Sequence, residues 1–138
     1  MAFTGNWTCN TFKTGLMNGT FDFTTDTFYI ALYTNAATLD ASTTAYTTTG
    51  EVVDAGYAAQ ALTIAQVPTI GNSGNTAYIS FGNVVWNSAL TARGALIYKA
   101  GDGGAICVLD FGSDKTSGAT FTVQFPDPSN TSAIIRIS

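Results

Sequence analysis

The chain has no histidine among its 138 residues, and histidine is the commonest general acid and base near neutral pH. Serine and cysteine hydrolases of the usual kind need an imidazole to take the proton of the nucleophile, so the sequence excludes them. The two cysteines are too few for a typical zinc site. We therefore expect a protein that is not an enzyme and that uses no cofactor and no metal.

Charged residues are also scarce, at 10% of the chain, with nine acidic against five basic residues. Because phosphate binding needs clustered cations, we expect no nucleic-acid partner. Polar uncharged residues, among them 23 threonines, must cover the surface instead. Such surfaces repel one another little, which suits contacts between subunits. The basic residues are scattered along the chain: Lys13, Arg93, Lys99, Lys115 and Arg136.

Long hydrophobic runs are absent as well. No stretch approaches the roughly 18 apolar residues of a membrane span, so we expect no membrane partner. Residues Met1–Thr8 lack the basic start and the apolar run of a signal peptide, so we expect no export by that route. Cys9 and Cys107 are then expected to be reduced, with Cys107 in the core and Cys9 near the surface. A disulfide between them is the alternative.

What is present favours β-structure. Helical spacing of apolar residues predicts one short helix over Thr8–Met17, ended by Asn18-Gly19. The next strand, Thr27–Tyr33, alternates and so places Phe28, Ile30 and Leu32 on one face, with the tyrosines on the other. Residues Thr34–Asp54 are read as one long connection, a length that is more often functional or ordered by a partner than idle.

The remainder predicts successive short strands separated by turns. The residues Gly101–Gly104 strongly favour a tight hairpin turn, and Pro68 with Gly71–Gly74 predicts a turn region. About eight strands at this spacing indicate an all-β protein, an antiparallel β-sandwich of jelly-roll type, with a barrel as the second choice. We expect an N-terminal arm and helix over residues 1–20 and the sandwich over 21–138. The expected strands are Tyr57–Ile64, Ala77–Phe81, Val84–Trp86, Ala92–Lys99, Ala105–Phe111, Thr120–Phe125 and Ala133–Ile137.

Three possible ligand or substrate sites stay open at this point. Acid pairs could serve a glycosidase, in which one carboxyl protonates the leaving group, although turn and strand-end roles explain these residues more simply. Aromatic side chains could form a sugar-stacking platform, as in carbohydrate-binding β-sandwich modules. Asp102 among glycines is a weak calcium candidate. The acid pairs are Asp22 with Asp26, Glu51 with Asp54, and Asp110 with Asp114.

Several motifs resemble a family of small virion proteins of tailed bacteriophages. They are Tyr29–Asn35, Thr49–Val52 with Gly56-Tyr57, Thr91–Tyr98 and Val108–Gly112, spread over about residues 20 to 138. The resemblance implies a capsid decoration (cement) protein on the outer surface of the head, made in the host cytoplasm. Its implied partners are the major capsid protein and copies of itself in a homotrimer. A tail or head-fibre component is the rival within that class.

A decoration protein needs a rigid scaffold and an arm or loop that reaches its neighbours. An aromatic pair on a mobile N-terminus is costly to leave in water, which favours placing it against another subunit. We expect this arm, residues Met1–Trp7, to be dispensable for the β fold. The expected interface residues are Phe3, Trp7, Tyr33 and Tyr46.

Overall fold

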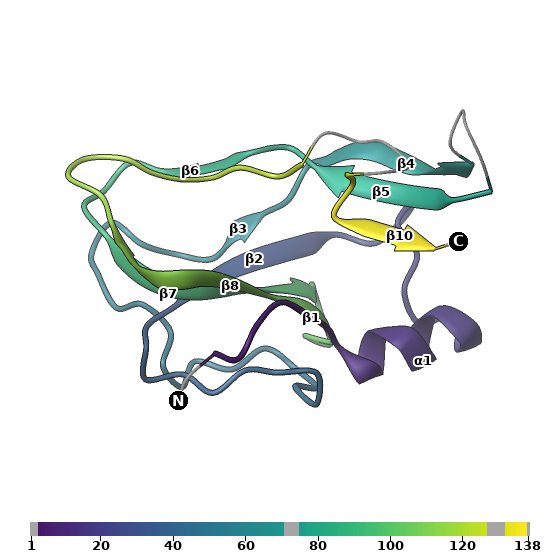
Figure 1. Ribbon diagram of the computed structural model, residues 1–138, viewed down its shortest axis with the longest axis horizontal. Helices are drawn as coiled ribbons and strands as arrows, with labels where there is room; N and C mark the ends of the chain where they lie inside the picture. The colour runs from purple at the N-terminus through teal and green to yellow at the C-terminus, as the bar shows by residue number, and fades with distance from the viewer. Residues whose placement is uncertain (1–2, 71–74, 127–131, 138) are drawn as a thin grey trace.

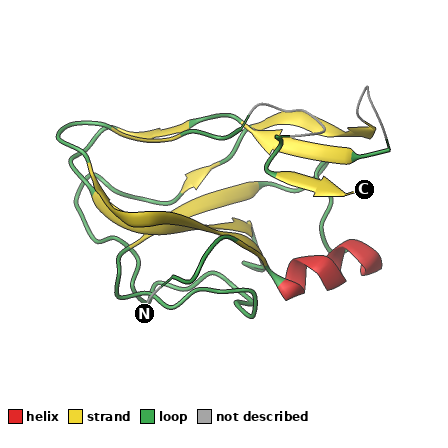
Figure 2. Ribbon diagram, viewed as in Figure 1, coloured by secondary structure: helices red, strands yellow, loops and turns green. Residues whose placement is uncertain are grey.

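The structure is a computed structural model that describes residues 3–70, 75–126 and 132–137, without the side chains of residues 65–70. Short antiparallel strands dominate these residues, with one helix near the N-terminus (Figure 2). The expected all-β class is therefore confirmed. The elements are β1 (Trp7–Thr8), α1 (Asn10–Asn18), β2 (Phe28–Tyr33), β3 (Gln60–Ala61), β4 (Ile64–Ile70), β5 (Ala77–Phe81), β6 (Val84–Trp86), β7 (Thr91–Lys99), β8 (Ala105–Thr116), β9 (Phe121–Val123) and β10 (Ile135–Ile137).

The strands lie in two layers (Figure 1). One layer is a five-stranded sheet in the order β1-β8-β7-β2-β3, and the other contains a three-stranded sheet, β10-β5-β4, beside the pair β6-β9. Every pairing between these strands is antiparallel. Phenylalanines from the two layers meet between them: Phe23 lies 4.8 Å from Phe28 of β2 and 6.4 Å from Phe81 of β5, measured between ring centroids.

Strand β2 is buried on both faces, because something covers each of them. Phe28, Ile30 and Leu32 are 0–1% exposed and face the layer interior, as their alternation predicts. Tyr33, on the opposite face, is also fully buried. Residues 34–54 run beneath this outer face of the five-stranded sheet (Figure 1), and the Tyr33 hydroxyl donates to the carbonyl of Thr47 at 2.7 Å.

The long connection after β2 is ordered by contacts within the chain. It forms isolated bridges at Leu39 with Phe3, at Ala45 with Gly104, and at Glu51 with Tyr33. Leu39 and Val52 are 2% and 7% exposed, so the segment contributes to the core as well as covering it. Buried apolar side chains and backbone bridges within the chain therefore contribute to ordering this connection.

Helix α1 begins two residues later than the sequence predicts. Cys9 takes the N-cap position with no side-chain hydrogen bond, and Gly19 ends the helix in a left-handed conformation with φ of 79°. Phe12 is buried, whereas Met17 is 93% exposed. Met17 directly follows Leu16, and successive helical residues point about 100° apart, so both cannot face the core.

The later strands occur where the sequence predicts them, although β8 is longer than expected and β9 and β10 are shorter. The predicted hairpin joins β7 to β8, and its Gly101 and Gly103 have φ of 95° and 74°. Strand β9 buries Phe121 and Val123 and leaves Thr122 outward, as alternation predicts. The turn expected at Gly71–Gly74 and the residues after Pro126 up to 131 lie outside the described residues.

The expected strand over Tyr57–Ile64 is present only in part, and the turn expected at Pro68 is wrong. Only Gln60–Ala61 and then Ile64–Ile70 are strands, so β4 runs through Pro68. Proline is tolerated there because β4 is an edge strand and its register with β5 shifts between Gln66 and Thr69.

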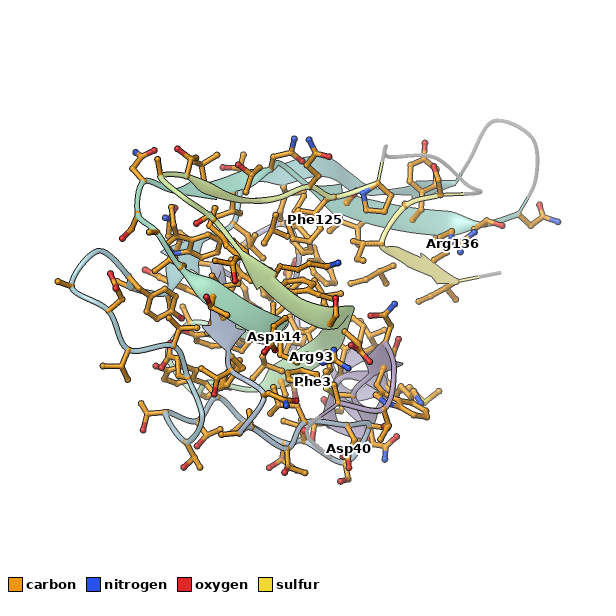
Figure 3. All side chains as sticks on the ribbon, turned by 60° about the vertical axis from the view of Figure 1, so that its left-hand side comes forward. Phe3, Asp40, Arg93, Asp114, Phe125 and Arg136 are labelled. Atoms are coloured by element: carbon orange, nitrogen blue, oxygen red, sulfur yellow. The ribbon has the colours of Figure 1, made fainter. Side chains whose placement is uncertain are left out.

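The expected free N-terminal arm is also wrong. Phe3 is 1% exposed, and Trp7–Thr8 pair with β8 as an edge strand of the large sheet. The space for the Phe3 ring exists because position 94 is glycine: a Cβ there would lie 2.4 Å from the ring. The Arg93 guanidinium lies 5.5 Å from the ring centroid, and Figure 3 shows the two side chains together. This segment therefore belongs to the same hydrophobic cluster as the strands.

Both cysteines are buried free thiols, so the expected surface position of Cys9 is wrong. Cys9 is 0% exposed because its backbone N–H donates to the Ile106 carbonyl at 2.8 Å, which draws the residue against β8. Burial raises the pKa of the Cys9 thiol to about 11 and raises the pKa of Cys107 further.

Candidate interaction surface

The first candidate acid pair, Asp22 with Asp26, accepts hydrogen bonds from neighbouring residues and so stabilises a local turn. Asp22 accepts from the Thr24 backbone at 2.8 Å and from its hydroxyl at 2.5 Å, and these bonds lower the pKa of Asp22. Asp26 in turn accepts from the Asp22 backbone N–H at 2.8 Å. A glycosidase acid must stay protonated near neutral pH and needs a raised pKa, so the pKa of Asp22 moves in the opposite direction.

Glu51 binds a hydroxyl donor with each of its two carboxylate oxygens. It accepts from the hydroxyls of Tyr46 at 2.6 Å and Tyr57 at 2.5 Å, one on each oxygen. The Tyr57 hydroxyl also accepts from the backbone N–H of Leu32 at 2.9 Å. Burial, followed by the Glu51 hydrogen bond, raises the pKa of both tyrosines. Glu51 thus joins the long connection to β2. Its predicted pair partner, Asp54, instead accepts from Gly56 and Ser88.

Asp110 lies inside β8, because this strand continues to Thr116 and not only to the predicted end at Phe111. It forms an ion pair with Arg93, whose hydrogen bond is the main cause of a lowered Asp110 pKa. Its backbone N–H donates to the Asn6 side chain at 2.6 Å, which helps fix the N-terminal segment. Asp102, the weak calcium candidate, accepts from Gly104 within the hairpin and lies 3.7 Å from Lys99.

The four predicted interface residues are in different environments. Phe3 and Tyr33 are 1% and 0% exposed, so neither is on the surface of this chain, and their expected role as surface contacts is corrected. The reason is the same for both: the N-terminal segment and the long connection fold back onto the outer face of the five-stranded sheet. Tyr46 is half-buried on Glu51, and Trp7 remains 40% exposed. A contact role for Trp7 or Tyr46 stays a prediction.

Three tyrosines form a continuous stack on the outer face of the same sheet. The ring centroids of Tyr46 and Tyr98 lie 4.5 Å apart, and those of Tyr29 and Tyr98 lie 6.0 Å apart, both nearly parallel. Burial and the charge of Glu51 raise the pKa of Tyr98 to about 12. Each of these rings uses a face to stack on another tyrosine, whereas a sugar-binding platform offers open ring faces to its ligand.

A groove opens between α1 and β10. Phe12, Leu16 and Met17 line it from the helix, Ile135 and Ile137 line it from the strand, and its volume is about 750 Å³. A smaller apolar cavity of about 100 Å³ continues inward between the same elements. A third depression prolongs the groove past Trp7 of β1. We call the whole feature the α1/β10 groove.

Sequence reasoning missed this groove, although two residues carried a signal. Met17 falls off the apolar face set by Phe12 and Leu16, and Ile137 sits near the end of the sequence on a short strand. They are 93% and 54% exposed. Trp7, the third exposed apolar side chain at this end, was recognised from the sequence but assigned to a free arm.

Comparison of the chain with protein-family models, with curated proteins and with solved structures finds no match. Within the described ranges, the structure contains no group of three or more cysteine, aspartate or glutamate side chains placed to hold a metal ion. No helix in the same part of the chain is long and apolar enough to cross a membrane.

Proposed function

We propose that this chain is a bacteriophage capsid decoration protein, which binds the outer surface of the head and stabilises contacts between major capsid subunits. We further propose that its two layers form a jelly-roll-like β-sandwich. The observation that carries the proposal is how the side chains are used. Carboxylates such as Glu51 and Asp110 are bound in internal contacts. Three of the five exposed large apolar side chains of the described residues line one groove and its extension.

The resemblance of the sequence motifs to phage virion proteins suggests the viral role, and the anchored fold is compatible with it. A structural protein on a capsid needs a stiff body, and here the long connection and the N-terminal segment are both anchored on the sheet. Repetition on a symmetric shell multiplies weak contacts into avidity, so modest patches suffice. Homotrimer formation would add to that avidity.

The test is binding of the purified protein to expanded capsids that lack it, followed by counting the copies bound per particle. We expect saturation at a number that scales with the number of capsid subunits, together with greater resistance of the particle to heat. Binding of a few copies at one vertex would support a tail or head-fibre component instead. Absence of binding to any viral particle, with selective binding on a glycan array, would favour the carbohydrate-binding alternative.

A further inference from the structure

The α1/β10 groove lies beside two strands that each end a sheet in the described part of the chain. Strand β10 is the terminal strand of its three-stranded sheet, and β1 is the terminal strand of the five-stranded sheet. Residues of both strands line the groove and its extension past Trp7. In Figure 1, β10 lies between β5 and α1, so its open edge faces the helix. An open edge presents backbone N–H and C=O groups that another strand can pair with.

The side chains around this edge are unusually apolar for an exposed position. Met17 is 93% exposed, Ile137 is 54% exposed and Trp7 is 40% exposed. They are three of the five large apolar side chains that are exposed in the described part of the protein. Their clustering at one groove is the arrangement expected of a contact surface rather than of scattered surface residues.

A basic side chain, Lys13, lines the groove from α1 and is exposed. None of the aspartate and glutamate residues of the described part lines the groove or its extension. Arg136, labelled in Figure 3, also lines the groove but interacts within the chain, so its charge does not enter the argument. The protein as a whole is acidic, at −4, so a groove whose described lining has an exposed lysine and no carboxylate differs from that overall balance.

We propose that the α1/β10 groove binds an extended, acidic segment of a partner protein by strand addition to the edge of β10. Its backbone would pair with β10, its apolar side chains would pack on Phe12, Leu16 and Met17, and a carboxylate would face Lys13. A strand is favoured over a helix because an edge strand offers main-chain partners that only an extended segment can use.

This inference concerns one surface and stands whether or not the chain decorates a capsid. Because β10 has only three residues, main-chain pairing is limited, and side-chain burial and charge must supply much of the affinity. Because side-chain contacts supply much of the affinity, the groove should select acidic segments in which apolar residues alternate with polar ones.

The test uses three fluorescent nine-residue peptides and the full-length protein. The first alternates valine with threonine and carries two aspartates, the second carries two lysines in place of the aspartates, and the third has prolines at alternate positions. We expect only the aspartate peptide to bind in the millimolar range or tighter by fluorescence anisotropy. We also expect it to shift the NMR amide signals of β1, α1 and β10. Equal binding of the lysine or proline peptide, or shifts confined elsewhere, would overturn the proposal.

Matched variants separate the groove from the rest of the surface. Lys13→Glu should lower the affinity for the aspartate peptide by about three- to fivefold, as expected for loss of one exposed ion pair. Lys115→Glu should leave this affinity unchanged. Met17→Ser should weaken it by about fivefold through lost apolar contact, whereas Val53→Ser, at a position 96% exposed, should not. All four positions are exposed, and circular dichroism verifies that each variant folds.

A second copy of this chain is the competing occupant. Light scattering after size-exclusion chromatography distinguishes it. If the wild-type protein is an oligomer that Met17→Ser and Lys13→Glu convert to monomer, the groove is a self-interface and the proposal of an external acidic strand is overturned. Capsid binding is measured separately, so failure of the peptide experiment leaves the proposed function to be judged on its own test.

Discussion

Gly94 shows how one missing side chain positions the N-terminal segment. A Cβ at this position would lie 2.4 Å from the Phe3 ring and 2.5 Å from the backbone oxygen of Leu109. The ring could move aside, but the backbone of a central strand pair cannot move without disturbing the sheet.

We therefore expect Gly94→Ala to lower the free energy of unfolding by about 1–3 kcal/mol, the usual cost of overpacking a core. Urea denaturation followed by tryptophan fluorescence measures the change. Gly118→Ala is the matched control, because its added Cβ would meet nothing within 4 Å, and it should alter stability by no more than about 0.5 kcal/mol. Equal effects of the two variants would contradict this account of Phe3.

The Arg93–Asp110 ion pair should make stability depend on pH in the acid range. The pKa of Asp110 is lowered from its ordinary value of 3.8 by the Arg93 hydrogen bond. A lowered native pKa means that the pair stabilises the fold above pH 3.8 and that this contribution is lost as the pH falls through the native pKa.

Asp110→Asn should thus lower the free energy of unfolding by about 1 kcal/mol near neutral pH. The stabilities of the variant and the wild type should converge as the pH falls below 3.8. Thermal unfolding from pH 7 to pH 2.5 measures both curves. Asp114→Asn, four residues along in the same strand and exposed, serves as the control. A difference that persists unchanged at the lowest pH would show that Asp110 acts through shape rather than charge.

At the scale of the elements, the long connection between β2 and β3 depends on Glu51. Its carboxylate accepts hydroxyls from Tyr46, in the same connection, and from Tyr57, whose hydroxyl also bonds to the backbone of β2. Removing the carboxylate leaves both half-buried hydroxyls without this acceptor.

We expect Glu51→Ala to lower the free energy of unfolding by about 1–3 kcal/mol and to open the connection to limited proteolysis near Thr48 and Thr49, which are exposed. Mass spectrometry of the first cleavage products locates the site. Glu51→Gln, which keeps one acceptor oxygen, should have a smaller effect. First cleavage elsewhere in both variants would mean that the buried Leu39 and Val52, rather than Glu51, hold the segment in place.

The N-terminal segment is an element of the core with one exposed aromatic residue. Phe3→Ala should lower the free energy of unfolding by about 3–5 kcal/mol, because the ring is 1% exposed. Trp7→Ala should cost far less, since that ring is 40% exposed. Thermal unfolding of the two variants tests this contrast. Removal of the first seven residues should consequently destabilise the fold, so a capsid-binding defect is better sought with Trp7→Ala.

At the scale of the whole molecule, one hydrophobic cluster includes the N-terminal segment, α1, the long connection and both layers of strands. Such continuity favours a single cooperative unfolding transition. Cys9 and Cys107 lie inside this cluster at 0% and 6% exposure, so their thiols report on global opening.

We expect neither thiol to react with an aromatic disulfide reagent at pH 8 in the native protein, because burial raises the pKa of Cys9 to about 11 and keeps both sulfurs from the reagent. In urea, two thiols should react rapidly. Their rates across a urea series should follow the unfolding transition. Rapid reaction of one thiol in the absence of urea would reveal local opening at the β1–β8 edge.

The sequence by itself determined the strand class, the single short helix, the hairpin at Gly101–Gly104 and the alternating faces of β2 and β9. These are local properties: periodicity and turn chemistry act over a few residues. The tertiary structure decided that Phe3 and Tyr33 are buried, that Pro68 lies within an edge strand, and that Met17 and Ile137 meet across a groove. Each of these depends on which distant segment covers a given face, and no pattern in neighbouring residues encodes that.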